Sequence, residues 1–505
     1  MQNKNITKRS LIIHPFLISS LPVLFLLAFN AHELPLQDVL IPIAISIVIS
    51  FIIWIILRQI LNGVKAGLII SALILLFSIY GHIKNQLIID ENEMIQFLGS
   101  NLVLGGIFLT IGILALIFFI KTKSYNELNS IFNVIAITIV TILILNIGLY
   151  YVTNSSDSIE LDFVDGSLII NEVNEKPDVF VFILDEFAGE KQLQMDFEYD
   201  LKPFMIELEK RDFIVPKDSF SNYPNTEFSL PSFLNMNYLD KVTVELGPDS
   251  TDKRKLIELA NRSYVMQMFD LQEYHVTTFY GGLGAVGDTL FVDEKLCSYG
   301  TINGDLRKNF VLTYLPITYF NTVLLENFQF DKLECVFSYI QDFKSDKEQP
   351  HFVFAHLRLP HDPFIFDSHG NQISTDPELK INKKAYLEQL IFTERKILDL
   401  IDSVQKQSPD AVIIVHSDHG FRAEINWEQP TDDDLIRGFN IVSAIYFPNS
   451  SVDISDKLSL VNLYRILFNT YFNTNYEILE DKHFWYESSS PYVHIDVTDR
   501  LNSLT

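Results

Sequence analysis

Five long apolar segments near the N-terminus restrict the fold of this chain more than any other feature. None contains Asp, Glu, Lys or Arg, and they cover residues 11–29, 39–57, 66–83, 97–120 and 130–152. Roughly 20 apolar residues in a helix cross about 30 Å of hydrocarbon. Basic residues precede the first segment, as in a signal peptide, but no convincing small-residue cleavage site follows it. We therefore predict a membrane domain of five transmembrane helices over residues 1–152.

The charges between these segments predict how the chain crosses the membrane. Basic residues lie before the first span and in every second loop after it, at Lys4, Lys8, Arg9, Arg58, Lys65, Lys121 and Lys123. The alternate loops are mostly acidic, with Glu33, Asp38, Lys84, Asp90, Glu91 and Glu93. Loops rich in Lys and Arg stay in the cytoplasm. We therefore expect a multi-pass membrane protein with a cytoplasmic N-terminus and, after five spans, an extracytoplasmic remainder.

The remainder differs from the membrane domain in charge. It contains 30 Lys and Arg against 58 Asp and Glu, whereas the first 152 residues contain 8 and 6. So acidic a domain is a poor partner for nucleic acid, and we expect none to bind. A polar stretch at 153–176 predicts a linker before a soluble domain at 177–505. Cys297 and Cys335 are the only cysteines, and they either form a disulfide outside the cytoplasm or remain as two buried thiols.

Apolar runs alternate with helical patterns in the soluble domain. Buried strands are predicted within 178–184, 352–355, 410–420 and 439–448, and helices at 253–271, 383–406 and 457–471. This alternation favours a mainly parallel sheet that is covered on both faces. Residues 449–505 have no assigned role, and their extended "PYVHIDVTD" segment is expected at an edge of the sheet.

Acidic and imidazole side chains follow three of the predicted strands. Asp185 follows the first, His356 ends the second with His361 close behind, and Asp418 and His419 follow the third. Ligands of parallel α/β sheets bind at the carboxyl ends of the strands. Carboxylate oxygens and imidazole nitrogens are common metal ligands. A polar turn explains any one of these sites, but three together favour a metal centre.

The segment "SFSNYPNTEFSLPSFLNMNYL" (219–239) offers a nucleophile. Thr226 or Ser229 is expected near the N-terminus of a helix, where backbone amides favour anions. A hydroxyl held by a divalent cation loses its proton more easily and can attack. The alternative is that these hydroxyls only cap the helix, as Ser and Thr often do.

Four motifs in this order resemble those of a known superfamily. "DVFVFILDE", "NYPNTEFSLPSFLNM", "HLRLPHDPF" and "VHSDHG" are similar to motifs of the alkaline phosphatase superfamily. They are most similar to its sulfatase-like branch, which includes membrane-bound lipoteichoic acid synthases and phosphoethanolamine transferases. The resemblance covers roughly 176–448, and the preceding spans match the layout of those transferases. It implies an α/β/α catalytic domain with a divalent metal at the sheet edge, here outside the membrane.

The resemblance also implies roles for individual residues. Asp185, Asp418 and His419 would hold one divalent ion (Mn, Mg, Zn or Ca), and Thr226 would be both a ligand and the nucleophile. His361 would contact the anionic group of the substrate or the leaving oxygen.

Further residues are expected around the substrate. His356, Arg422 and Arg437 are candidates for binding its anion, although a surface position is the alternative for either arginine. Glu186 either contacts the site residues without binding the metal itself or faces solvent. His416 is expected to be a structural histidine.

One motif departs from the true sulfatases. These carry a Cys or Ser that becomes formylglycine within a C/S-x-P-x-R pattern, but here Phe233 stands where the Arg belongs. This argues against formylglycine at Ser229. The T-x-x-S-x-P spacing instead resembles the threonine motif of the phosphoethanolamine transferases, which favours Thr226.

The sequence therefore predicts a membrane-anchored, metal-dependent hydrolase or transferase. Its expected substrate is a phosphoester on a lipid or an envelope glycan, and its expected partners are the bilayer and that lipid-linked or glycan substrate. One alternative is hydrolysis of a sulfate ester by the same metal site. Another is an inactive protein that binds the cell envelope. A transporter has little support because the spans contain almost no internal acids or bases.

Overall fold

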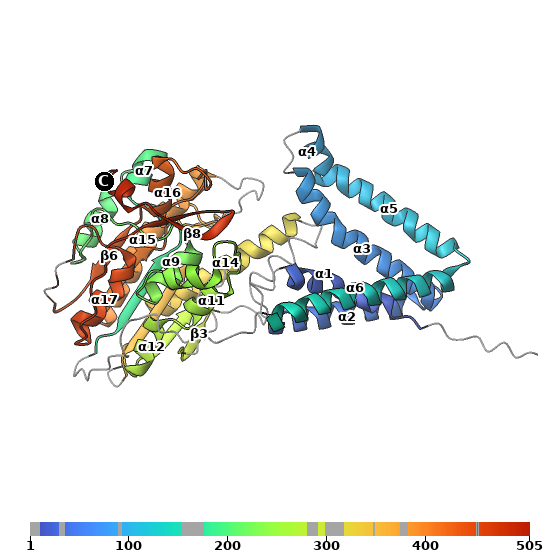
Figure 1. Cartoon of the computed structure of the whole chain (residues 1–505), viewed down its shortest axis with the longest axis horizontal. Helices are drawn as coiled ribbons and strands as arrows, with labels where there is room; N and C mark the ends of the chain where they lie inside the picture. The colour runs from blue at the N-terminus through green and yellow to red at the C-terminus, as the bar shows by residue number, and fades with distance from the viewer. Residues whose placement is uncertain are drawn as a thin grey trace, which may run out of the picture. The chain divides into compact units, whose positions relative to one another are not determined.

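The structure, a computed structural model, describes residues 11–29, 36–88, 93–153, 176–279, 291–297, 318–346, 349–373, 382–450, 452 and 454–504. The chain divides into two compact units, the first over residues 1–159 with 300–325 and the second over 160–299 with 326–505 (Figure 1). The predicted linker at 153–176 lies almost wholly outside the described residues, as do Lys4, Lys8 and Arg9.

The described part of the first unit is helical and apolar. Its helices are α1 (His14–Phe29), α2 (Leu36–Leu57), α3 (Gly63–Ile88), α4 (Glu93–Gly99), α5 (Asn101–Lys121) and α6 (Tyr125–Thr153). Four of them, α2, α3, α5 and α6, are long and apolar enough to cross a membrane. Helix α1 has 16 residues, fewer than the roughly 20 that a full span requires. The chain thus has four to five apolar N-terminal helices. The span predicted at 11–29, which contains α1, stays a prediction.

A six-stranded sheet forms the centre of the second unit. Its strands are β1 (Val179–Leu184), β2 (His275–Phe279), β3 (Glu294–Leu296), β4 (His351–Leu357), β5 (Val412–Ser417) and β6 (Ser443–Tyr446). They lie in the order β3-β2-β4-β1-β5-β6, and only the β5–β6 pair is antiparallel. The predicted mainly parallel sheet is confirmed. Strands β2 and β3 were not predicted, because "HVTTF" and "EKL" contain no long apolar run.

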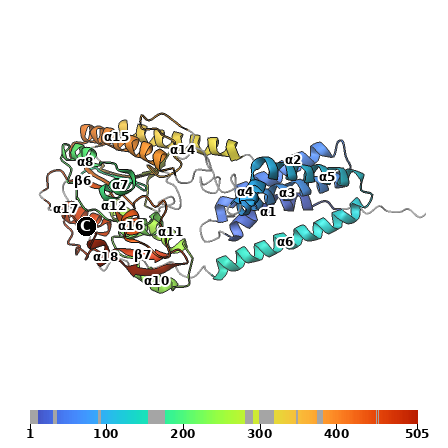
Figure 2. The ribbon, with the colours of Figure 1, turned by 90° about the horizontal axis from the view of Figure 1, so that it is seen from above.

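Helices cover both faces of this sheet. Phe180 and Phe182 of β1 face a core that includes α8 (Lys202–Glu209), α14 (Thr318–Gln341) and α15 (Lys383–Gln407). Val179, Val181 and Ile183 face a second core with α9 (Thr226–Leu234), α12 (Tyr264–Leu271) and α17 (Leu460–Tyr471). Figure 2 shows α14 and α15 on one side of the domain and α12 and α17 on the other. Because both faces are buried, β1 is apolar at every position, as the sequence predicted.

Two details differ from the sequence-based prediction. The helix predicted at 253–271 is interrupted between α11 (Arg254–Asn261) and α12, where the Ser263 side chain caps α12 by accepting from the Met266 amide. The C-terminal extended segment is not an edge of the main sheet. It forms β8 (Ser490–Asp496), which pairs only with β7 (Phe484–Glu487) in a separate two-stranded sheet.

The two cysteines are joined. Cys297 follows β3 and Cys335 lies in α14, and their sulfurs form a disulfide. This decides between the two sequence-based alternatives in favour of the bridge.

Candidate metal centre and active site

The register of the parallel strands brings two carboxylates together. Leu184, the last residue of β1, pairs with Leu357 of β4 and with Ser417 of β5. The next residues along β1 and β5 are Asp185 and Asp418, so both emerge at the same edge of the sheet. The predicted convergence of polar side chains at the carboxyl ends is therefore observed.

Asp185, Asp418 and His419 form a compact buried group. Each offers one ligand atom, and these atoms lie within 4.8 Å of one another. Nε2 of His419 is 3.4 Å from Oδ2 of Asp418 and 3.8 Å from Oδ1 of Asp185. Such spacings are too long for hydrogen bonds but suit several ligands arranged around one cation.

Thr226 completes this group from a different element. It is the first residue of α9, and the preceding Asn225 caps the helix by accepting from the Phe228 amide at 3.1 Å. Oγ1 of Thr226 lies 2.7 Å from Oδ2 of Asp418 and 3.0 Å from Nε2 of His419. The helix N-terminus thus carries the hydroxyl to the carboxyl edge of the sheet.

The protonation of His419 follows from its other ring nitrogen. Nδ1 lies 2.8 Å from the carbonyl oxygen of Gly420, which can only accept, so Nδ1 carries the proton. When the ring is neutral, Nε2 therefore presents a lone pair to Thr226. The single hydroxyl proton of Thr226 cannot serve both this lone pair and Asp418. A cation between these atoms gives a partner to the Thr226 oxygen, to Nε2 of His419 and to Oδ2 of Asp418.

Two further buried groups at the same edge lack hydrogen-bond partners among the described residues. They are Oδ1 of Asp185 and both ring nitrogens of His356. Nε2 of His356 lies 3.9 Å from Oδ2 of Asp185 and 4.0 Å from Oδ2 of Asp418. Buried polar atoms normally have hydrogen-bond partners, so these unpaired atoms also fit a bound cation. The oxygen and nitrogen donors suit several divalent metals and select none.

Hydrogen bonds hold Asp418 in its ionised form. Its Oδ1 accepts from the backbone amides of Glu186 at 3.2 Å and of His419 at 3.0 Å. Burial raises the pKa of Asp418, but the charges of His419 and His356, with hydrogen bonds from the Thr226 hydroxyl and the Glu186 amide, outweigh it and lower the pKa. The carboxylate is therefore charged and ready to bind a cation at neutral pH.

Ser229, the alternative nucleophile, has a different partner. Its hydroxyl donates to the backbone oxygen of Asp418 at 2.8 Å and is buried in α9. It supports the turn that presents Asp418 rather than joining the ligand group. Phe233, in the position where sulfatases carry an Arg, is fully buried and packs edge-on against His416 with ring centroids 5.0 Å apart.

Glu186 links two of the predicted substrate-binding residues. Its Oε1 accepts from the Arg422 amide at 3.0 Å, and its Oε2 lies 3.8 Å from Nε2 of His361. Only 8% of Glu186 is exposed, which excludes the solvent-facing alternative. Burial lowers the pKa of His361, but the charges of Asp185 and Glu186 outweigh it and raise the pKa to about 9. The two carboxylates thus favour a protonated His361 beside the ligand group.

Arg437 and His416 have other surroundings. The Arg437 guanidinium donates to both oxygens of Asp196, at 2.7 and 2.9 Å, and so joins α16 (Asp432–Phe439) to α7 (Glu190–Phe197). Its role in substrate binding stays a prediction that none of these contacts favours. Nδ1 of His416 lies 2.9 Å from the Ser417 carbonyl, and burial lowers the pKa of this histidine to about 4. A neutral, structural His416 agrees with the sequence-based expectation.

Two residues at this edge were not identified from the sequence. Asn225, the cap of α9, was read only as part of a polar segment. Its Nδ2 donates to the hydroxyl of Tyr486, which comes from β7 in the C-terminal region. No local pattern marks Tyr486, because only the folded chain brings it next to α9.

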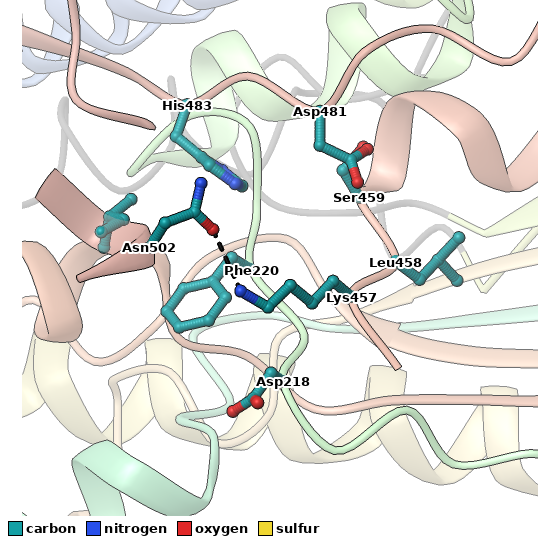
Figure 3. A pocket seen from close by; sticks show the side chains of 9 residues that line it. Asp218, Phe220, Lys457, Leu458, Ser459, Asp481, His483 and Asn502 are labelled. Carbon is teal, nitrogen blue, oxygen red and sulfur yellow. Dashed lines mark hydrogen bonds between the residues drawn. The ribbon is translucent and has the colours of Figure 1, made fainter. Parts of the chain in front are cut away.

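A pocket elsewhere on the second unit contains none of the predicted site residues (Figure 3). Its lining includes Asp218, Phe220, Asp481 and His483. Lys457 points into it and donates to Oδ1 of Asn502 at 3.2 Å. The lining mixes both charges and has no group of ligand atoms like that at the sheet edge. The candidate metal centre therefore fits a catalytic role better than this pocket does.

Comparison with known proteins places this geometry in a family. The family model described as Sulfatase matches residues 177–448, which is more than half of the chain. The chain belongs to the sulfatase family. Asp185, Thr226, Asp418 and His419 of this sulfatase-family protein all lie within the matched residues, whereas Tyr486 lies outside them. No curated protein matches the chain in the search of such proteins.

Several solved structures are similar to this sulfatase-family chain. The C-terminal periplasmic domain of EcEptC from Escherichia coli is 14% identical, covering 65% of this chain and 95% of that one, with a TM-score of 0.41. The lipoteichoic acid synthase LtaP from Listeria monocytogenes is 9% identical, with coverages of 65% and 88% and a TM-score of 0.39. The integral membrane protein lipooligosaccharide phosphoethanolamine transferase A (EptA) from Neisseria meningitidis is 13% identical, with coverages of 86% and 88% and a TM-score of 0.34.

Proposed function

We propose that this protein is a membrane-anchored, metal-dependent enzyme that cleaves or transfers a phosphoester through a covalent intermediate on Thr226. The single observation that carries the proposal is the position of Oγ1 of Thr226, 2.7 Å from Asp418 and 3.0 Å from His419. A nucleophile and its activating groups must lie at such distances. The helix cap alone does not explain this position, because Asn225 already caps α9.

The residues would act as follows. Asp185, Asp418, His419 and Thr226 would hold one divalent cation, which lowers the pKa of a bound hydroxyl and polarises a phosphoryl oxygen. Thr226 gives its proton to Oδ2 of Asp418, its hydrogen-bond acceptor, as its oxygen attacks phosphorus. The ester oxygen leaves with a proton from His361, and the phosphorus stays on Thr226.

A second attack completes the cycle. Water or an acceptor hydroxyl gives its proton to His361 and attacks phosphorus. The bond to Thr226 then breaks, and the Thr226 oxygen takes back its proton from Asp418. With water the protein is a hydrolase, and with a sugar or glycerol hydroxyl it is a transferase. Arg422, paired with Glu186, and His356 are proposed to bind the non-bridging oxygens of the substrate.

Phosphorus rather than sulfur chemistry is supported by the region around Ser229. Phe233 is a core residue where the formylglycine motif requires an Arg, and Ser229 donates to the Asp418 backbone. A sulfate ester remains the alternative substrate for the same metal site.

We also propose that the catalytic domain lies outside the cytoplasm. The Cys297–Cys335 disulfide supports this location, because disulfides persist in oxidising compartments. Attachment to the membrane raises the effective concentration of a lipid-linked donor or an envelope glycan at the site. We therefore place the natural substrate in one of these two classes.

A comparison of three esters tests the proposal. Full-length protein, purified in detergent, is incubated with p-nitrophenyl phosphate, bis-p-nitrophenyl phosphate or p-nitrophenyl sulfate, with Mn, Mg or Zn or with a chelator. Thr226→Ala is run beside Ser232→Ala, a control in the same helix whose hydroxyl donates to the Asn237 carbonyl at 2.7 Å. The proposal requires metal-dependent turnover of a phosphorus ester that only Thr226→Ala abolishes. Turnover of the sulfate alone contradicts it, as does activity that survives Thr226→Ala.

A further inference from the structure

The C-terminal hairpin of β7 and β8 lies outside the residues that match the sulfatase family, yet it is bonded to the segment that carries the nucleophile. The Phe484 amide donates to the Asn222 carbonyl at 2.9 Å, and Nδ2 of Asn222 donates to the Lys482 carbonyl at 2.9 Å. Nδ1 of His483 lies 2.8 Å from the Ser221 carbonyl. These bonds place the hairpin beside the residues that lead into α9.

Tyr486 is the residue of this hairpin that contacts the helix cap. Oδ1 of Asn225 is occupied by the Phe228 amide, so Nδ2 is the atom that donates to the Tyr486 hydroxyl. The hydroxyl oxygen is thus an acceptor, and its own proton is left for another group. Within the part of the chain that the structure describes, no residue accepts that proton.

The surroundings of Tyr486 favour an anion as the missing acceptor. Burial raises the pKa of the Tyr486 hydroxyl, while the charge of Arg422 lowers it and the charge of Glu227 raises it. Nε of Arg422 is buried, lies 3.5 Å from Oε1 of Glu186 and makes no hydrogen bond to a described residue. Two donors that lack acceptors therefore lie near the N-terminus of α9, where Thr226 and the helix amides also favour negative charge.

The hydroxyl is not required to position the ring. Tyr486 packs against Phe228 with ring centroids 4.8 Å apart and against Trp427 at 5.5 Å. Only 6% of the residue is exposed. A phenyl ring fills the same space, so the hydroxyl and the packing can be separated by experiment.

We propose that Tyr486 is a substrate-binding residue of the active site, whose hydroxyl accepts from Asn225 and donates to a non-bridging oxygen of the phosphoester. The inference rests on the proposed function and adds to it a residue from outside the family-matched region. In this arrangement the hairpin completes the anion site, and one hydroxyl couples the substrate to the cap of the nucleophile's helix.

Phosphate binding by two tyrosine variants tests this role. Inorganic phosphate is titrated calorimetrically into the full-length protein in detergent with Mn, for the wild type, Tyr486→Phe and Tyr492→Phe. Tyr492 is the matched control, since it belongs to the same hairpin and packs on Phe228, but its hydroxyl donates to the Asp252 carbonyl. Thermal unfolding of all three proteins is measured in parallel.

The inference predicts phosphate binding about tenfold or more weaker in Tyr486→Phe, because a hydrogen bond to a charged group is lost. Tyr492→Phe is expected to bind like the wild type. Equal binding by the wild type and Tyr486→Phe overturns the inference, and so does equal weakening in both variants. Either result leaves the proposed function intact if Thr226-dependent turnover of a phosphorus ester persists. Absence of that turnover in the wild type overturns both.

Discussion

Oγ1 of Thr226 lies 2.7 Å from Oδ2 of Asp418, although the two residues are 192 positions apart in the sequence. The contact joins the start of α9 to the end of β5. Asp418 is fully buried and Thr226 partly buried, and each belongs to a different element, so the geometry is fixed by the fold and not by a local motif.

Replacement of Thr226 distinguishes a nucleophilic role of its hydroxyl from a purely structural role in α9. Thr226→Ala is expected to lower turnover of a phosphorus ester by about 10³-fold or more, because no hydroxyl remains between Asp418 and His419. Thr226→Ser is expected to restore part of it. Unfolding temperatures should stay close to that of the wild type, since Asn225 still caps α9. Steady-state kinetics and thermal unfolding check this, and an active Ala variant contradicts it.

Ser229 is expected to behave differently. Ser229→Ala removes the hydrogen bond to the Asp418 backbone, so activity should fall by about tenfold without being lost. The same kinetic assay, with the metal concentration varied, measures the effect. Loss of activity as complete as that in Thr226→Ala would assign the nucleophile to Ser229.

Close packing around Gly420 leaves no room for a side chain in the turn that carries Asp418 and His419. A Cβ at this position would lie 2.3 Å from the Arg437 carbonyl oxygen and 2.7 Å from Oε1 of Gln192. Gly420→Ala is therefore expected to destabilise the second unit by about 1–3 kcal/mol and to displace His419. Gly106→Ala in α5 is the control, since a Cβ there has no described atom within 4 Å. Thermal unfolding and turnover that match the control contradict this explanation.

A buried acid outside the active site predicts a pH-dependent stability. Burial raises the pKa of Glu394 to about 8, against a hydrogen bond from Tyr199 that lowers it. Between the ordinary pKa of 4.5 and about 8, the folded chain holds a proton that the unfolded chain has released. The free energy of unfolding should therefore fall as pH rises through this window and then level off.

Glu394→Gln is expected to remove this contribution. Its unfolding temperature relative to the wild type should rise between pH 5 and pH 9, by roughly 2–4 °C for each kcal/mol involved. The Gln carbonyl can still accept from Tyr199, so the comparison isolates the charge. Parallel unfolding curves for the two proteins at all pH values contradict the prediction.

The Cys297–Cys335 disulfide predicts how many thiols react and that the second unit lies outside the cytoplasm. Protein taken from intact cells should expose no reactive thiol under denaturing conditions until it is reduced, and two afterwards. The paired variant Cys297→Ser with Cys335→Ser should unfold at a lower temperature, since the bridge closes a loop of 38 residues. Two free thiols in freshly isolated protein contradict the extracytoplasmic location.

The sequence predicted the part of the fold that depends on burial of continuous apolar runs. Strands such as β1 and β5 are buried on both faces, so every residue is apolar until the polar end appears. That change from apolar to polar identified Asp185, Asp418 and His419. Strands β2 and β3 carry polar residues and were missed, because β2 is buried by neighbours distant in sequence and β3 is a short, partly exposed strand.

Contacts between distant segments explain what the sequence did not reveal at the site. Glu186 has its role because Arg422 and His361 lie on either side of it. Tyr486 lies 261 residues after Asn225, and no spacing rule relates them. The prediction for Arg437 followed from its charge alone, whereas in the fold both carboxylate oxygens of Asp196 accept from one edge of its guanidinium group.

Covalent trapping on Thr226 tests the central claim most directly. Metal-loaded, full-length protein is mixed with bis-p-nitrophenyl phosphate, quenched in acid within the first turnover, digested and mapped by mass spectrometry. The proposed mechanism predicts a p-nitrophenyl phosphate adduct on Thr226 that appears before steady state and is absent from Thr226→Ala. Turnover at a comparable rate with no adduct, or an adduct on Ser229 instead, would contradict it.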